Sequence, residues 1–293
     1  MTVDIRPAEK ADVDALARFW HENMNSRVPL ERWRSVASAP WYTQPPSHGW
    51  IAVDNGRIVG AMALVHSTRA IDGRIEKLCN IGSLYVLREY RGRGIARAIA
   101  RDCSSDDSIT YFGIDAAPQT RAVLEPPEAG YRVLDRERYV WTPRREGKKG
   151  DGGFFLRKMP PSPFFPDDWP PAEQHILEHH LPLGMVPVSA ISASSECRLL
   201  LWIRNKSSPT LYYEVLYASD YEAFGNLGQQ IADHLTPPGT GVLAVDARFY
   251  DRPPPGAEVE PLKQARHYKS TRLAPHQIDL LYSEVPLLGL KIS

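Results

Sequence analysis

The stretch VLREYRGRGIARAIA, residues 86–100, places Arg-Gly-Arg-Gly directly before a segment with helical spacing. Glycine loses more backbone freedom on folding than any other residue, so two glycines beside a helix start need a reason. The first turn of a helix leaves about four amide groups without internal acceptors, at the positive end of the helix dipole. Because Gly92, Gly94 and Ala96 have small side chains, an anion could approach those amides closely. The stretch therefore predicts a phosphate site, with the neighbouring arginines as further donors.

Two well-known phosphate loops do not fit this stretch. A P-loop needs GxxxxGK[ST], and no lysine followed by serine or threonine occurs here. A dinucleotide-binding fingerprint needs GxGxxG directly after a first strand. The sequence GRGIAR at residues 92–97 lacks the third glycine and follows several expected strands. A different kind of phosphate-binding loop is therefore expected.

The segments around the glycine stretch predict an α/β domain. Residues 2–7 favour a short edge strand, and helical spacing begins near Lys10 and again at Pro29. Asp54-Asn55-Gly56 and residues 71–74 supply the positive backbone angles that hairpin turns need. The remaining expected elements are a strand at 74–87, a helix from 94, a strand at 108–115, a short helix from 116, and a final hairpin of residues 131–143 and 152–159.

The loop and this order of elements together resemble the GNAT acetyltransferases, whose pyrophosphate loop has the pattern Q/R-x-x-G-x-G/A. Residues 91–96 fill every position of that pattern. The resemblance implies the GNAT fold, a mixed and mostly antiparallel sheet flanked by helices, over residues 1–159. It also implies acyl-CoA binding, with the pantetheine arm on the preceding strand and the pyrophosphate on the loop. The residues implied are Leu84, Tyr85, Val86, Arg91, Gly92, Arg93, Gly94, Ile95, Ala96 and Arg97.

The usual catalytic residues of that family are absent from this sequence. In the family, the strand before the loop splays from its neighbour, the thioester lies in the gap, and an amine attacks it directly. Many members place Glu eleven residues before the motif, where this chain has Asn80, or His nine residues before, where it has Gly82. Pro126 stands at the position of the usual tyrosine acid. The proton acceptor, which an amine nucleophile needs, must come from another residue.

His66 is one substitute that strand parity suggests. If the second turn centres on Asp72, His66 lies opposite Lys77 or Leu78 and shares a sheet face with Asn80. Its ordinary pKa near 6.5 suits a base. A slip of one residue in the register would turn it to the other face, where it would be a structural histidine.

Two carboxylates are further candidates for the proton acceptor. Glu76 shares a face with Asn80 farther along the same strand, and Asp115 ends the next strand on the expected acceptor side. Each could equally be an exposed carboxylate at a strand end. The candidate catalytic residues are therefore His66, Asn80, Glu76 and Asp115.

The second half of the chain predicts another α/β domain. The proline-rich segment PPSPFFPDDWPP at 160–171 indicates a stiff linker, which leaves residues 172–293 as a separate unit. Its expected order of strands, helix and strands resembles the first half, without a glycine-rich arginine loop. We therefore expect a degenerate GNAT-like domain that does not bind CoA phosphates, with a late strand at IDLLYSEVPLLGL (278–290).

Composition excludes several classes of protein. The 293 residues include 35 basic and 35 acidic side chains, so no general attraction to nucleic acid or anionic membranes is expected. The three cysteines are scattered, and we find no signal peptide or membrane span in the sequence, which favours a cytoplasmic protein. His175 and His179 share a helical face, but no further ligands complete a metal site, so none is expected.

The sequence thus predicts an N-acyltransferase that moves an acyl group, expected to be acetyl, from CoA to a small amine. Two alternatives stay open: a CoA-binding sensor that has lost catalysis, and an acyltransferase for a macromolecular acceptor. We keep a homodimer as one expectation for its assembly.

Overall fold

The computed structural model describes residues 3–114, 118–144, 154–158, 169–193, 195–205 and 209–290. The chain forms two compact units. Unit 1 comprises Met1–Leu134, Gln264–Gln277 and Tyr282–Leu290, and unit 2 comprises Asp135–Lys263 and Ile278–Leu281. Each unit thus includes residues from both sides of the expected linker, whereas the sequence suggested a contiguous division. Residues 160–168 of that linker lie outside the described residues.

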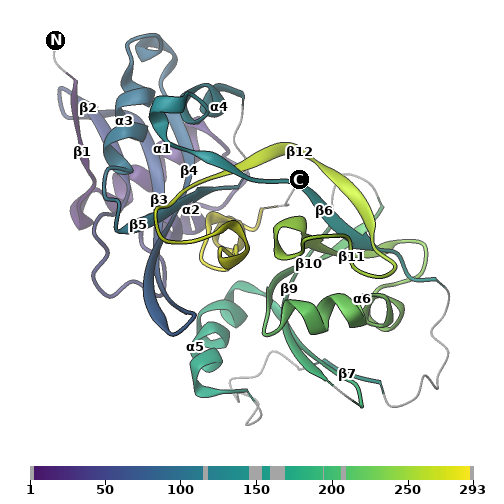
Figure 1. Ribbon diagram of the computed structural model, residues 1–293. Helices are drawn as coiled ribbons and strands as arrows, with labels where there is room; N and C mark the ends of the chain where they lie inside the picture. The colour runs from purple at the N-terminus through teal and green to yellow at the C-terminus, as the bar shows by residue number, and fades with distance from the viewer. Residues whose placement is uncertain are drawn as a thin grey trace. The chain divides into compact units, whose positions relative to one another are not determined.

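Unit 1 contains a sheet whose first five strands lie in the order of the sequence (Figure 1). They are β1 (Asp4–Pro7), β2 (Trp50–Asp54), β3 (Arg57–Ile71), β4 (Arg74–Val86) and β5 (Ile109–Gly113). The pairs from β1 to β4 are antiparallel, and β4 pairs with β5 in parallel. The sheet is therefore mixed and mostly antiparallel, as the sequence predicted.

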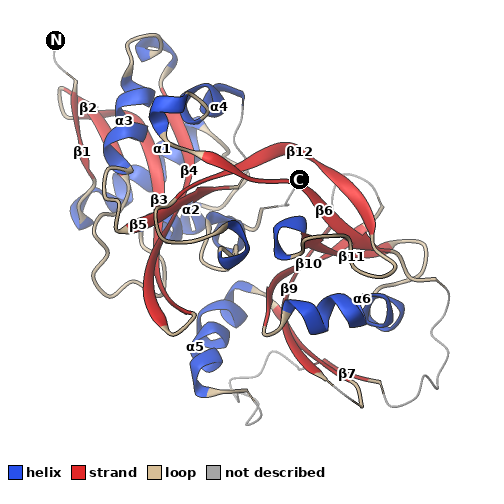
Figure 2. Cartoon of the chain, viewed as in Figure 1, coloured by secondary structure: helices blue, strands red, loops and turns tan. Residues whose placement is uncertain are grey.

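Helices accompany this sheet at the predicted places (Figure 2). They are α1 (Val13–Asn23), α2 (Leu30–Ala37), α3 (Ile95–Cys103) and α4 (Pro118–Leu124). In α1 the apolar residues Leu16, Ala17 and Trp20 recur at helical spacing and are buried. The apolar face of this helix therefore helps to form the core of unit 1.

The two hairpin turns of unit 1 set the register of its long strands. Asn55 and Gly56 have φ of 48° and 78°, and Asp72 and Gly73 have φ of 49° and 75°. Both turns thus have two residues in the left-handed region, as type I′ hairpin turns require. The second turn places Ile71 opposite Arg74, and the pairing then runs unbroken back to β3 residue 63.

Strands β4 and β5 stay paired over only part of their length. Their pairing runs from Lys77 opposite Ile109 to Asn80 opposite Phe112. Beyond that point β4 contains a bulge against β3, because Gly82 lies opposite Ala63 whereas Tyr85 lies opposite Ala61. A bulge kinks a strand and re-aims its side chains. The two parallel strands therefore stop pairing near the middle of β4.

The predicted final hairpin of the first half is wrong. Strand β6 (Arg132–Trp141) pairs with β11 (Gly241–Asp246), and β7 (Phe155–Lys158) pairs with β8 (Val186–Ile191). The strand that follows β5 in the sheet of unit 1 is instead β12 (Glu258–Lys269), with His267 opposite Gly113. The two halves of the sequence thus exchange a strand, and local patterning cannot reveal such an exchange because both strands look alike.

Unit 2 has the strand order β6-β11-β10-β9-β8-β7. Besides the strands named above it contains β9 (Glu196–Asn205), β10 (Leu211–Ala218), α5 (Pro171–His180) and α6 (Tyr221–Leu235). Strands β10 and β11 are parallel and α6 connects them, as α3 connects β4 and β5. Its core includes Trp141, Phe224 and Leu243, all fully buried. Both units thus have the α/β class that the sequence predicted.

One further element differs from the sequence prediction. Residues 284–288 form helix α7 (Glu284–Leu288) rather than a strand, and all of its residues are buried in unit 1. Ser283 caps this helix, because its hydroxyl accepts a hydrogen bond from the Val285 amide. The end of the described chain therefore contributes to the interior of unit 1.

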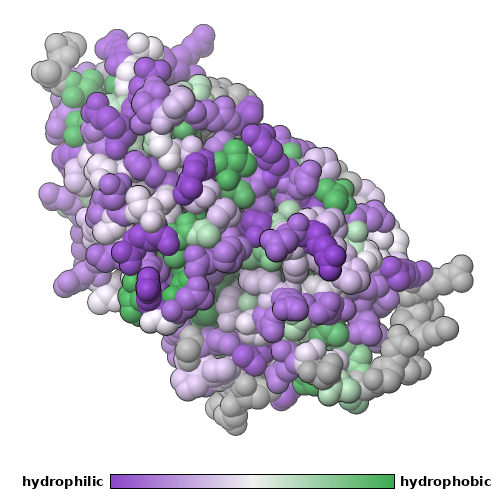
Figure 3. Space-filling view, viewed as in Figure 1, coloured by the Kyte–Doolittle hydropathy of each residue, from purple (hydrophilic) through white to green (hydrophobic). Residues whose placement is uncertain are grey.

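The visible surface of the chain is mostly hydrophilic, with apolar residues scattered over it (Figure 3). Large apolar side chains that are exposed, such as Ile75 and Phe155, are few among the described residues. No helix in the described ranges is long and apolar enough to cross a membrane.

Candidate functional site

Several amide groups at the amino end of α3 have no acceptor within the described part of the chain. Gly94 is the N-cap residue, with φ of 79°, and Gly92 has φ of 78°. The first helical hydrogen bond runs from the Ala98 amide to the Gly94 carbonyl at 2.9 Å. Among the described residues, no acceptor is recorded for the amides of residues 94–97. These amides and the helix dipole therefore favour an external anion at this end of the helix.

The glycines of this loop are needed for its conformation. Both φ values lie in the left-handed region, which L-residues with a side chain adopt at a cost. A Cβ at either position would meet no atom within 4 Å. The space above the loop is thus open, and the backbone conformation rather than crowding selects glycine here.

The arginines of the loop are held close to it. The Arg91 Nε donates to the Val86 carbonyl at 3.0 Å, and its guanidinium lies 5.3 Å from the Tyr85 ring centroid. Arg93 donates to the Glu89 carbonyl at 3.0 Å and lies over the Tyr90 ring. These contacts fix two positive charges beside the open amides.

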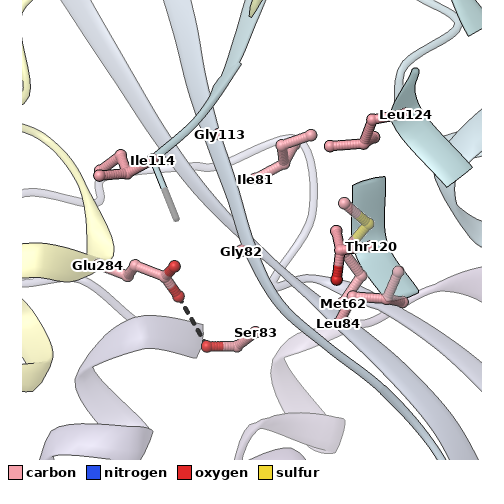
Figure 4. A pocket seen from close by; sticks show the side chains of 10 residues that line it. All are labelled: Met62, Ile81, Gly82, Ser83, Leu84, Gly113, Ile114, Thr120, Leu124 and Glu284. Atoms are coloured by element: carbon pink, nitrogen blue, oxygen red, sulfur yellow. Dashed lines mark hydrogen bonds between the residues drawn. The ribbon is translucent and has the colours of Figure 1, made fainter. Parts of the chain in front are cut away.

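A second feature of unit 1 is a cavity at the place where β4 and β5 separate (Figure 4). Its volume is about 40 Å³. It is lined by Met62, Ile81, Gly82, Ser83, Leu84, Gly113, Ile114, Thr120, Leu124 and Glu284. The separation of the strands, rather than a surface groove, thus creates this space.

The cavity has side chains from both faces of the sheet. Met62 belongs to the α3 side, because its sulfur lies 3.7 Å from the Cys103 sulfur at the end of that helix. Figure 4 shows Met62, Thr120 and Leu124 on one side of β4 and Glu284 on the other. A ligand that entered from the α3 side could therefore meet a ligand from the Glu284 side within this gap.

Glu284 is a site residue that the sequence reasoning missed. The residue is only 7% exposed, and its carboxylate accepts a hydrogen bond from the Ser83 hydroxyl at 2.6 Å. Its backbone amide donates to the Asn80 Oδ1 at 2.9 Å. About 200 residues separate it from β4, so no local spacing could have linked them. The only local signal is a helix-capping serine before it.

Asn80, a predicted catalytic residue, has a positioning role instead. It is fully buried, and its Nδ2 donates to the Phe112 carbonyl at 3.0 Å while its Oδ1 binds the Glu284 amide. The carboxamide thus ties β4 to β5 and holds the start of α7. An amide is also too weak a base to accept an ammonium proton.

Glu76 lies at an ion pair away from the cavity. Its carboxylate accepts two hydrogen bonds from Arg272, at 2.7 and 2.9 Å. The Arg272 guanidinium lowers the pKa of this carboxyl group from its ordinary value. Glu76 is therefore an ionised partner of Arg272, and it does not line the cavity.

The expected position of His66 is wrong. The turn places it opposite Cys79 rather than Lys77 or Leu78, so it lies on the sheet face opposite to Asn80. Burial lowers its pKa to about 4, and its Nε2 lies 3.3 Å from the Ser47 hydroxyl. His66 is thus a buried neutral histidine outside the cavity. Asp115, the fourth candidate, lies outside the described residues.

Comparison with known proteins agrees with this geometry. Residues 14–104 match the model of the acetyltransferase (GNAT) family. This match includes β4, the glycine loop and α3. The resemblance predicted from the loop is therefore confirmed for this part of the chain.

Solved structures show the same fold over nearly the whole chain. A protein from Enterococcus faecalis, described as a probable N-acyltransferase, has a TM-score of 0.58 and 13% identity, with coverage of 94% of this chain and 74% of that one. A GCN5-related N-acetyltransferase from Anabaena variabilis has a TM-score of 0.56 and 10% identity, with coverage of 91% and 72%. Eis1 from Mycobacterium abscessus has a TM-score of 0.50 and 15% identity, with coverage of 92% and 73%. At these identities the likeness establishes the fold alone.

No curated protein sequence matches the chain. In the part of the chain that the structure describes, no group of three or more His, Cys, Asp or Glu side chains could hold a metal ion.

Proposed function

We propose that this protein is an acyl-CoA-dependent N-acyltransferase with acetyl-CoA as donor and a small amine as acceptor. The open amides at the start of α3, next to the gap between β4 and β5, are the observation that carries this proposal. The CoA pyrophosphate would bind the amides of residues 94–97, with Arg91 and Arg93 as further donors. The match to the GNAT family supports the same chemistry.

The thioester end of the donor would lie in the cavity between the strands. The pantetheine arm would follow Leu84, Tyr85 and Val86 of β4, where the loss of pairing with β5 leaves backbone groups for a ligand. The acyl carbonyl would then reach the gap beside Gly82. An amide of the β4 bulge would stabilise the negative charge that develops on the carbonyl oxygen during attack.

The size of this cavity favours a short acyl group. A cavity needs roughly 10–15 Å³ to hold one water molecule, so about 40 Å³ holds about three. An acetyl group has a comparable number of heavy atoms. A longer acyl chain would have to displace Ile81, Leu124 or Glu284, which supports acetyl-CoA as the donor.

A second cavity suits the other end of the donor. It lies along the exposed side of α3, has a volume of about 240 Å³, and is lined by Arg97, Arg101 and Lys269 among others. Arg97 and Arg101 follow the loop along α3 by one and two turns, and Lys269 comes from β12. The adenosine 3′-phosphate of CoA would bind there, so acetyl-CoA should bind more tightly than its 3′-dephospho form.

Calorimetry and turnover together test this function. The full chain should bind acetyl-CoA more tightly than butyryl-CoA, and it should release thiol when an amine from a panel of alkylamines, aminosugars and amino acids is added. Binding of CoA without transfer to any amine or protein acceptor would favour a sensor instead. Transfer to lysine side chains of proteins alone would favour the macromolecular acceptor. No measurable binding of acetyl-CoA would refute the proposal.

A further inference from the structure

Among the described residues that line the cavity between β4 and β5, one has an ionisable side chain, and it comes from α7, late in the sequence. This residue is Glu284; every other lining residue is apolar or carries only a hydroxyl group. We propose that the Glu284 carboxylate binds the acceptor as a protonated amine and then takes its proton. This inference rests on the proposed function, because it assigns the proton acceptor of that reaction.

The strand β4 is built to receive this carboxylate. A Cβ on Gly82 would lie 2.2 Å from the Glu284 carboxyl group, so any side chain there would collide with it. Ser83 has φ of 45°, which a residue with a side chain adopts only at a cost, and in this conformation its hydroxyl donates to the Glu284 carboxylate. Three residues of β4 thus help to place Glu284: Asn80 and Ser83 hydrogen-bond to it, and Gly82 leaves space for its carboxylate.

The side of the sheet on which Glu284 lies indicates whether it meets the acceptor or CoA. The open amides belong to α3, which contacts Met62 on one side of the sheet, whereas Glu284 lies on the other side of β4. A donor bound at α3 would present its acyl group through the gap toward Glu284. The group that meets Glu284 is therefore the acceptor rather than any part of CoA.

A buried carboxylate selects the charge of this acceptor. Glu284 would attract an ammonium group and disfavour an anionic acceptor, because charges interact strongly where little water screens them. Arg32 of α2 lies at the far end of α7, beside Gly289, and Arg69 of β3 lies over the ring of Tyr282. Asp115, which follows Ile114 in the sequence, is outside the described residues. The substrate class is thus a primary alkylamine that is protonated at neutral pH.

The proposed steps balance in atoms and charge. Glu284 takes one proton from the bound ammonium, which leaves a neutral amine with a free electron pair. The amine nitrogen attacks the thioester carbon, so a C–N bond forms; the C–S bond then breaks with its electron pair on sulfur. The thiolate takes a second proton from the former ammonium nitrogen and leaves as CoA thiol, and Glu284 returns its proton to water. The products are the amide, CoA and one proton.

The variant E284Q tests this role through the pKa of the acceptor. Glutamine keeps the shape and can still accept the Ser83 hydrogen bond, but it cannot take a proton. With an alkylamine that is protonated at pH 7, kcat/KM should fall by about 10² to 10³. With an alkoxyamine or hydrazide, which is already neutral at pH 7, the fall should be below about fivefold. As the pH rises toward the pKa of the alkylamine, more of the amine is already neutral. The ratio of kcat/KM between the original protein and E284Q should therefore shrink about tenfold per pH unit.

Other results would overturn the assignment. A purely structural role would lower kcat/KM by the same factor for both kinds of amine and at every pH. An unchanged rate with the protonated amine would exclude Glu284 as the proton acceptor. The control E76Q should show neither dependence, and if it does, Glu76 is the acceptor instead.

The failure of this inference can be told apart from failure of the proposed function. The affinity of E284Q for acetyl-CoA, measured by calorimetry, should stay within about twofold of the original, because Glu284 does not contact the α3 amides. If E284Q fails to fold, Ser83→Ala gives a milder test, with a loss of roughly three- to tenfold confined to protonated amines. An original chain that binds acetyl-CoA but acylates no amine would refute the proposed function itself, and this inference with it.

Discussion

The two units contain the same strand–helix–strand arrangement but treat its helix start in opposite ways. In unit 1, β4 leads through Gly92 and Gly94 into α3, and the helix start carries no capping side chain. In unit 2, β10 leads into α6, and the Asp220 carboxylate accepts a hydrogen bond from the Ala223 amide at 2.9 Å. The amides at the start of α3 are thus available to an external anion, whereas at the start of α6 the protein's own Asp220 carboxylate takes the position of such an anion.

The carboxyl ends of the parallel strands differ in the same sense. At the end of β11 in unit 2, the Arg248 guanidinium binds both Asp246 and Asp135 and donates to the Ile278 carbonyl at 2.8 Å. At the corresponding place in unit 1 there is a cavity whose described lining includes the Glu284 carboxylate. Unit 2 therefore neutralises its charges internally, while unit 1 retains groups that a ligand can use. The strand–helix–strand arrangement alone therefore does not make a binding site; the groups at its helix start and strand ends decide whether a ligand can bind.

The largest expected effect concerns the internal charges of unit 2. Arg248→Met would leave two buried carboxylates without their cation, which should lower the free energy of unfolding by about 3 to 5 kcal/mol. Urea denaturation followed by circular dichroism measures this loss, and hydrogen exchange in β11 locates it. Adding D135N and D246N should restore much of the stability. A loss below about 1 kcal/mol would contradict the view that this ion pair completes unit 2.

Closing the open helix start of unit 1 should produce the next largest effect. Gly94→Asp would place a carboxylate among the α3 amides, as in α6, and should weaken acetyl-CoA binding roughly hundredfold, or about 2.7 kcal/mol. Gly73→Asp is a matched control, because Gly73 has φ of 75° and also has no atom within 4 Å of a Cβ. The control has the same backbone cost and the same added charge, but it lies in the turn between β3 and β4 rather than at the α3 amides. It should therefore bind acetyl-CoA normally. Equal affinity in both variants would mean that the pyrophosphate binds elsewhere.

The converse change in unit 2 should have a smaller effect. Asp220→Ala removes the cap of α6 and should lower the free energy of unfolding by about 1 kcal/mol. Asp220→Asn retains a capping side chain and should lose at most a few tenths of that amount. Neither variant should change the affinity for acetyl-CoA, because α6 lacks the flanking arginines. Thermal unfolding and calorimetry of the same preparations provide both measurements.

His66 should show the smallest effect at neutral pH, since it lies in unit 1 but outside the cavity. His66→Gln should leave turnover within about threefold, and the pH dependence of the rate should match that of the original protein. Because burial lowers the folded pKa to about 4 from 6.5, the unfolded chain binds more protons between these values. The stability that neutral His66 provides is thus complete above pH 6.5 and declines as the pH falls toward 4. The original protein should lose up to roughly 3 kcal/mol of unfolding free energy in this pH range because of His66, and His66→Gln should not show this loss.

A pH titration of chemical denaturation checks the His66 prediction. The unfolding free energies of the two proteins should converge or cross as the pH falls from 6.5 to 4. A gap that is independent of pH would mean that His66 does not titrate differently in the folded chain. Loss of turnover in the variant would show that the cavity is not the reacting site.

Much of unit 1 could be predicted because its signals are local. The two turns, at Asn55-Gly56 and Asp72-Gly73, need positive φ angles that few residues supply, and the sequence marks them directly. The small residues Gly92 and Gly94 likewise predict the start of a helix. Even here, a shift of one residue in the second turn was enough to place His66 on the wrong face, because side chains alternate along a strand.

The sequence by itself determined the resemblance to GNAT acetyltransferases, the open helix start and the elements that carry it, since each follows from residues close together in the chain. Only the tertiary structure decided that β6 and β12 are exchanged between the units, and that Glu284 lies beside Gly82 and Ser83. Those contacts join residues more than a hundred positions apart, whose partners are selected by packing in the folded protein. No spacing or periodicity within either segment specifies that choice.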